Sequence, residues 1–172
     1  MPGSSSNESA AASGKTIAGL DFDARSIELA RAQAAQAGVA DRVRFHAAPV
    51  EALPAEPRWD LVTTFDVIHD LPDPAAALAH IRAGLADGGT YLMVEPKVAD
   101  DLAANLGNPF ARMFRAISCL HCVPQSLAQG GPGLGTCMGP AHIGELMREA
   151  GFTRVAPLDI RSNVLSFHAV RH

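Results

Sequence analysis

Two acidic residues stand directly after apolar segments of a length that suits buried strands. Asp21 closes KTIAGLD, and Glu95 is the carboxylate near the end of TYLMVEP. Open α/β sheets bind their ligands beyond the carboxyl ends of the strands. Asp21 is therefore expected at a ligand-binding edge, although a capping or surface role is the alternative.

A second group follows the apolar segment DLVTTF, where Asp66 and His69 occur in FDVIHD. A histidine with an ordinary pKa of about 6.5 can take a proton from a hydroxyl or an amine. His69 is therefore a candidate general base. In the alternative, His69 and Asp70 only hold the loop in place through hydrogen bonds.

The three cysteines are candidate metal ligands. Cys119, Cys122 and Cys137, followed by His142, imitate a zinc site with three cysteines and one histidine. However, the first two lie in the apolar stretch ISCLHCV, where a free cysteine behaves as a small buried hydrophobe. We expect reduced thiols and no metal at these four residues.

Strands and helices alternate along the chain and would position these groups. After KTIAGLD, the expected strands are RVRFHA, WDLVTTFDVI and TYLMVEP. The second of these, WDLVTTFDVI, is apolar enough to be covered on both faces of the sheet. A helix beginning at Asp23 has Ile27, Ala30, Ala34 and Ala37 at helical spacing and ends at Gly38.

The pair Asp73-Pro74 starts another helix, which we expect to run to about Ala86 before a turn at Gly88-Gly89. This alternation predicts parallel strands joined by helical crossovers, and hence a doubly wound α/β sheet.

The alternation is interrupted between residues 97 and 140, which we interpret as a cap facing the substrate. It contains the helical pattern NPFARMFRAISCL, whose apolar residues would line a pocket, and the flexible loop QGGPGLG. A helix from about Ala141 to Ala150 follows. The segments FTRVAPLDI and SNVLSFHAV, with a short turn at Arg161-Ser162, then predict a terminal antiparallel hairpin.

Composition limits the partners. The 172 residues carry a formal net charge of -4, so no basic field attracts nucleic acid or anionic lipid. Residues 1–14 are small and polar and are expected to be a disordered lead-in, with residues 15–172 forming one domain. Residues 1–14 also lack the apolar core of a signal peptide, and we therefore expect a cytoplasmic protein.

Taken together, the acid at Asp21, FDVIHDLPDP, LADGGTYLMVEP and EAGF before a hairpin resemble class I S-adenosylmethionine-dependent methyltransferases. The resemblance covers roughly residues 15–172. It is closest to a bacterial subgroup with a segment similar to CVPQSLAQGG, whose longer members carry a winged-helix-like segment at the N-terminus. It implies a Rossmann-like fold, S-adenosylmethionine as cofactor and methyl transfer to a small molecule.

The resemblance also implies roles for individual residues. Asp21 would hold both ribose hydroxyls, because its two oxygens can accept two hydrogen bonds. Phe22 would flank the adenine. Pro49 occupies a position where the family often has an aspartate, which leaves only the Val50 N–H as a main-chain donor there. Asp66 would lie near the methyl donor and His69 near the entering substrate.

One family feature is missing: nothing between Met1 and Gly19 resembles the first strand and the glycine-rich turn that holds the methionine half of the cofactor. Loss of that central strand would expose two rows of backbone groups or force its neighbours together. Two alternatives therefore stay open, an inactive remnant or interaction module and an NAD-binding oxidoreductase. A partner copy could also complete the sheet.

Overall fold

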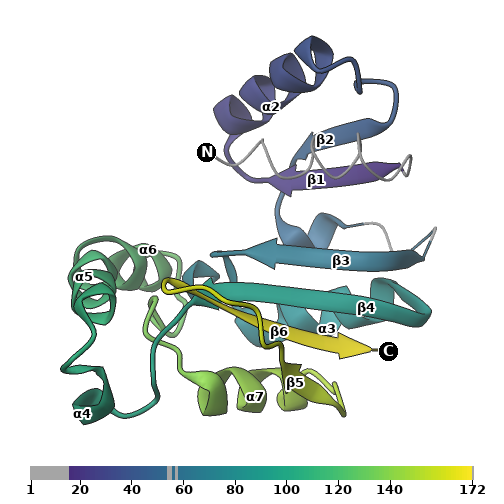
Figure 1. Cartoon of the computed structure of the whole chain (residues 1–172). Coiled ribbons are helices and arrows are strands. Elements are labelled where there is room, and N and C mark those ends of the chain that lie inside the picture. The colour runs from purple at the N-terminus through teal and green to yellow at the C-terminus, as the bar shows by residue number, and fades with distance from the viewer. Residues whose placement is uncertain (1–15, 54–55, 57, 172) are drawn as a thin grey trace. The chain divides into compact units, whose positions relative to one another are not determined.

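The structure is a computed structural model that describes residues 16–53, 56 and 58–171. The expected disordered lead-in, residues 1–14, lies outside this range. The chain divides into two compact units, residues 1–53 and 54–172, and each is described by itself (Figure 1).

Unit 1 contains a two-stranded parallel sheet and one helix. Strands β1 (Ile17–Asp21) and β2 (Val43–Ala47) pair from Ile17 opposite Val43 to Asp21 opposite Ala47. Helix α2 (Ala24–Gln36) connects them, as predicted for a parallel pair. The core of this unit consists of Ile27, Ala30, Ala34, Val39, Val43 and Phe45, so three of the four predicted helix positions are buried and Ala37 is exposed.

Local chemistry sets the bounds of α2. The Asp23 carboxylate accepts hydrogen bonds from the backbone N–H groups of Arg25 (3.2 Å) and Ser26 (3.0 Å). Gly38 follows the helix with a φ of 68°, which favours glycine. Gly19 in β1 has a different role, because a Cβ there would lie 2.8 Å from the Phe45 ring.

Unit 2 contains a four-stranded mixed sheet. Its strands are β3 (Trp59–Phe65), β4 (Leu85–Pro96), β5 (Val155–Pro157) and β6 (Leu165–Arg171), in the order β3-β4-β6-β5. The β3–β4 pair is parallel, whereas β6 is antiparallel to both β4 and β5. The predicted α/β fold and terminal antiparallel hairpin are therefore confirmed.

Helices α3 (Pro74–Gly84) and α7 (Pro140–Glu149) contribute to the core of unit 2. Helix α3 begins as predicted, with Asp73 accepting a 2.8 Å hydrogen bond from the Ala76 N–H. In the sheet, Tyr91 stacks on Phe152 with 5.7 Å between ring centroids. The largest fully buried apolar side chains of this unit are Ile68, Leu78, Ile81, Leu85, Tyr91, Met93, Val94, Ile143, Met147 and Val170. No helix in the described part of the chain is long and apolar enough to cross a bilayer.

A cap segment, residues 97–140, gathers short helices beyond the carboxyl ends of β3 and β4 (Figure 1). They are α4 (Leu102–Asn105), α5 (Pro109–Ile117), the π-helix η3 (Ser118–Cys122) and α6 (Val123–Ala128). The Ser126 hydroxyl donates a 3.2 Å hydrogen bond to the Leu71 carbonyl, which ties α6 to the loop after β3.

Four details of the sequence interpretation were wrong. Helix α3 ends at Gly84, not near Ala86. Strand β4 begins at the next residue, because Leu85 pairs with Trp59 of β3, and the register between β3 and β4 shifts after that pair. Strand β3 is not covered on both faces, since Leu61 and Phe65 are 57% and 48% exposed.

The hairpin also differs from the prediction. Strand β5 has only three residues, and residues 158–164 form a longer connection than the expected two-residue turn. Finally, the predicted helix NPFARMFRAISCL is α-helical only as far as Ile117, and residues 118–122 form a π-helix.

Candidate active site

In unit 1, the carboxyl ends of β1 and β2 are held together beside Asp21. The backbone carbonyl of Asp21 accepts a 2.9 Å hydrogen bond from the Ala48 N–H, and its carboxylate Oδ1 accepts one from the Asp23 N–H at 2.8 Å. Phe22 is 75% exposed, so it is not a core residue. Asp21 therefore has one carboxylate oxygen engaged by the backbone and an exposed aromatic ring next to it.

Pro49 and Val50 follow directly after β2. Pro49 precedes the short 3-10 helix η1 (Val50–Ala52), and its carbonyl accepts a 3.0 Å hydrogen bond from the Ala52 N–H. Pro49 is exposed and Val50 half-buried. The structure thus places both residues next to the strand end that carries Asp21, in the same unit.

In unit 2, the central feature is a buried pair formed by His69 and Glu95. Each side chain is only 1% exposed, and His69 Nδ1 lies 2.5 Å from Glu95 Oε2. Glu95 Oε1 accepts a 3.1 Å hydrogen bond from the Ile68 N–H. Because an ionised carboxylate only accepts hydrogen bonds, Nδ1 carries the proton that it donates, and Nε2 is the nitrogen available to other partners.

Asp66 marks the turn that leads from β3 to this pair. Its φ of 56° is the only positive value among the described non-glycine residues, and aspartate tolerates this conformation better than most residue types. Its N–H donates to the Val94 carbonyl at 2.8 Å. The Asp66 carboxylate is 61% exposed, with Oδ1 3.8 Å from His69 Nδ1. The structure therefore brings the predicted residues Asp66 and His69 together.

Asp70 approaches the other side of the imidazole, with Oδ1 3.3 Å from His69 Nε2. Burial by itself lowers the pKa of His69. The hydrogen bond and negative charge of Glu95, together with the charges of Asp70 and Asp66, outweigh burial, so the pKa is raised. This environment stabilises an imidazolium ion.

Cys122 is the only described cysteine that is buried; Cys119 is exposed and Cys137 half-buried. Burial first, and the nearby Asp70 charge second, raise the pKa of the Cys122 thiol to about 12. Among the described residues, His69, Asp70 and Cys122 form one group with the ligand types of a metal site, and Asp66, His69 and Glu95 form another. Cys119, Cys137 and His142 belong to neither, so the four-residue zinc arrangement considered from the sequence is not formed.

Glu95 was not among the predicted site residues, although it was recognised as a carboxylate at a strand end. It follows His69 by 26 residues. The signal that could have identified it is the parallel pairing of β3 and β4, which brings the ends of both strands to the same edge. Nothing in the local sequence pairs it specifically with His69.

Helix α5 presents apolar side chains to solvent in the same unit. Phe110, Met113 and Ile117 are 38%, 46% and 43% exposed. An exposed apolar row of this kind on a segment beyond the strand ends is a candidate surface for an apolar ligand.

Comparison with known proteins gives concordant results. A family model described as "Methyltransferase domain" matches residues 3–151. The ubiquinone biosynthesis O-methyltransferase of Psychrobacter arcticus is 27% identical over 162 residues, covering 93% of this chain and 59% of that relative. The chain thus spans about three fifths of the length of this curated relative.

Solved structures share the fold. PigF with SAH superimposes with a TM-score of 0.70 at 16% identity, over 96% of this chain and 46% of PigF. An O-methyltransferase family 2 protein from Planctomyces limnophilus, in complex with apigenin, has a TM-score of 0.63 at 20% identity, over 91% of this chain and 42% of that protein.

Proposed function

Because the chain belongs to the family of class I S-adenosylmethionine-dependent methyltransferases, we propose that it transfers a methyl group from S-adenosylmethionine to a hydroxyl oxygen of a small molecule. Relatives that match most of the chain are named O-methyltransferases, which supports oxygen as the acceptor atom. The oxidoreductase alternative receives no such support.

The buried pair of His69 and Glu95 is the observation that carries this proposal. A hydroxyl oxygen attacks a methyl group faster when a base removes its proton. Glu95 fixes the orientation of the imidazole through Nδ1, so that Nε2 is the atom that accepts the substrate proton. His69 is 1% exposed and Cys122 of the cap segment lies beside it, so access of the substrate to Nε2 requires a shift of these neighbours.

The residues of unit 1 fit the nucleoside half of the cofactor. Asp21 has a carboxylate oxygen that can accept ribose hydroxyls, and the exposed ring of Phe22 can stack on a base. Pro49 provides no side-chain acceptor for the adenine amino group, and the described residues of unit 1 contain no glycine-rich turn. When bound, the cofactor supplies an electrophilic methyl group; this chain contributes mainly positioning.

The exposed apolar row of α5 favours an apolar substrate, and a phenol combines such a surface with an acidic hydroxyl. A small molecule rather than a nucleic acid agrees with the net charge of -4. A cytoplasmic location is part of this proposal, and a homo-oligomer is compatible with it.

The test uses the full chain with methyl-labelled S-adenosylmethionine and a panel of phenols and catechols. Mass spectrometry should detect a methyl ether together with S-adenosylhomocysteine. We expect His69→Gln and Glu95→Gln to lower kcat at least about 100-fold, the scale of general-base catalysis. Glu95→Gln should affect kcat more than KM, because Glu95 positions His69 and does not contact substrate.

His142→Gln is the matched control, because His142 is an exposed histidine outside the pair, and it should keep wild-type activity. If no phenol or catechol is methylated, or if His69→Gln is as active as wild type, the proposal is wrong. An inactive chain would favour the alternative of a non-catalytic remnant.

A further inference from the structure

Three side chains from two segments of unit 2 meet at the side of His69 that faces away from Glu95. A nitrogen of His69, a carboxylate oxygen of Asp70 and the sulfur of Cys122 all lie within 4.8 Å of one another. His69 and Cys122 are 1% and 3% exposed. Imidazole nitrogen, carboxylate oxygen and thiolate sulfur are the three ligand types that zinc uses in proteins.

The orientation of His69 is that of a metal ligand. Its Nδ1–H donates to Glu95 Oε2 at 2.5 Å, which directs the Nε2 lone pair toward Asp70. Histidines that bind zinc commonly donate their second ring N–H to a carboxylate, which fixes the tautomer and makes the ligand more basic. Glu95 satisfies this condition without being a ligand itself.

Asp70 adds an independent observation. The Cys122 thiol lies within hydrogen-bonding reach of the Asp70 carboxylate, but the buried Oδ1 has no other hydrogen-bond partner among the described residues and lies 3.3 Å from His69 Nε2. Two acceptor atoms at this distance repel each other unless a cation lies between them. Either a proton on Nε2 or a metal ion meets that need.

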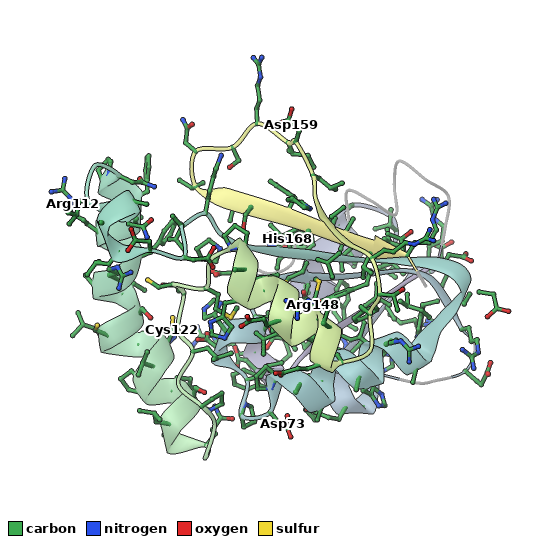
Figure 2. All side chains as sticks on the ribbon, turned by 90° about the horizontal axis from the view of Figure 1, so that it is seen from below. Asp73, Arg112, Cys122, Arg148, Asp159 and His168 are labelled. Atoms are coloured by element: carbon green, nitrogen blue, oxygen red, sulfur yellow. The ribbon has the colours of Figure 1, made fainter. Side chains whose placement is uncertain are left out.

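The π-helix η3 positions Cys122 beside His69 and Asp70. A π-helix inserts an extra residue into a helical turn and often occurs at functional sites. Cys122 is the last residue of η3, and Figure 2 shows it at the inner side of the cap segment. Cys119, on the same π-helix, is exposed.

We infer that His69 Nε2, Asp70 Oδ1 and Cys122 Sγ bind a Zn²⁺ ion, with water as the fourth ligand. Tetrahedral zinc separates its ligand atoms by about 3.3–3.6 Å. The His69–Asp70 distance of 3.3 Å already fits, and the sulfur needs a shift on the order of 1 Å. Binding releases the Cys122 thiol proton to solvent and, where His69 is an imidazolium, its Nε2 proton as well, so that the thiolate and Asp70 together balance the charge of the ion.

This site would regulate the chain. A zinc ion on Nε2 occupies the lone pair that accepts the substrate proton, so zinc should inhibit methyl transfer. Only this inhibition rests on the proposed function; the binding itself rests on the geometry of the three ligands.

The experiment titrates the full-length, metal-free chain with Co²⁺, a coloured substitute for zinc. We expect one Co²⁺ per chain, with a thiolate-to-cobalt charge-transfer band that Zn²⁺ abolishes by displacement. Cys122→Ala should remove the band, and Asp70→Asn should weaken Co²⁺ binding at least tenfold. Cys119→Ala is the matched control and should keep the band.

Far-ultraviolet circular dichroism of the metal-free variants verifies that they fold, and Asp70→Asn provides the test if Cys122→Ala does not. Absence of a stoichiometric band, or a band retained in Cys122→Ala, overturns the site. In active protein, equimolar Zn²⁺ should inhibit wild type and leave Cys122→Ala insensitive. A chain that binds Co²⁺ as described but methylates nothing supports the site and contradicts the proposed function, whereas methyl transfer without metal binding does the reverse.

Discussion

His69 and His168 are both buried histidines of unit 2, yet their surroundings act on them in opposite directions. Three carboxylates near His69 outweigh its burial and raise its pKa. His168 on β6 is 2% exposed, its Nε2 has no hydrogen-bond partner among the described residues, and burial lowers its pKa (Figure 2). Burial lowers the pKa of both histidines, and the direction of the net pKa shift depends on whether carboxylates lie close to the ring.

His168 should make the protein less stable in acid. The folded chain keeps this imidazole neutral, whereas the unfolded chain protonates it below its ordinary pKa of about 6.5. As pH falls below that value, the unfolded state binds more protons and the free energy of unfolding decreases, by at most about 1.4 kcal/mol per pH unit for this group. Urea denaturation at pH 7.5, 6.5 and 5.5 measures this slope.

His168→Leu should have a shallower loss of stability between pH 6.5 and 5.5 than wild type. His142→Gln, which changes an exposed histidine, should retain the wild-type slope. Parallel curves for wild type and His168→Leu would contradict the assignment.

At the scale of elements, α7 depends on a residue far away in the sequence. Gly139 precedes this helix and has no side chain to cap it. Asp100, in the loop after β4, caps the helix instead. Its Oδ1 accepts hydrogen bonds from the N–H groups of Ala141 (3.0 Å) and His142 (3.3 Å). A Cβ at Gly139 would lie 2.4 Å from the Asp100 backbone nitrogen, so only glycine leaves room for this contact.

Asp100→Ala should lower the free energy of unfolding by about 1 kcal/mol, because it removes the N-terminal cap of a helix that contributes to the core of unit 2. Asp100→Asn should retain most of the stability, since asparagine caps helices nearly as well. Chemical denaturation compares them with Asp159→Ala, an exposed loop substitution. Equal losses in Asp100→Ala and Asp159→Ala would show that the cap does not contribute.

At the scale of the whole molecule, the strands form two sheets. Strands β1 and β3 are the end strands of different sheets, and each has one edge without a strand partner among the described residues. The chain also spans 59% of the length of a curated relative.

Cofactor binding is therefore tested with the whole chain. Asp21→Asn should weaken binding of S-adenosylhomocysteine about tenfold or more in calorimetry, because a hydrogen bond to a charged acceptor contributes about 1.5–3 kcal/mol. Asp23→Asn is the control, since it changes the neighbouring aspartate and preserves the cap of α2. Unchanged affinity in Asp21→Asn would remove Asp21 from the cofactor site.

The sequence by itself determined the elements that depend on neighbours along the chain. The caps at Asp23 and Asp73, the end of α2 at Gly38 and the terminal hairpin were all predictable, because capping, turn formation and apolar periodicity are local. The placement of Asp66 and His69 after β3 followed from the same patterns.

Only the tertiary structure decided which distant groups meet. The pairing of β3 with β4 brings Glu95 to His69, the π-helix brings Cys122 to Asp70, and a loop brings Asp100 to α7. These contacts join residues that are 26 or more positions apart, and no local pattern encodes which partner each group meets. His69 was thus predictable as a chemical group, while the carboxylates that set its pKa and orientation became visible only in the fold.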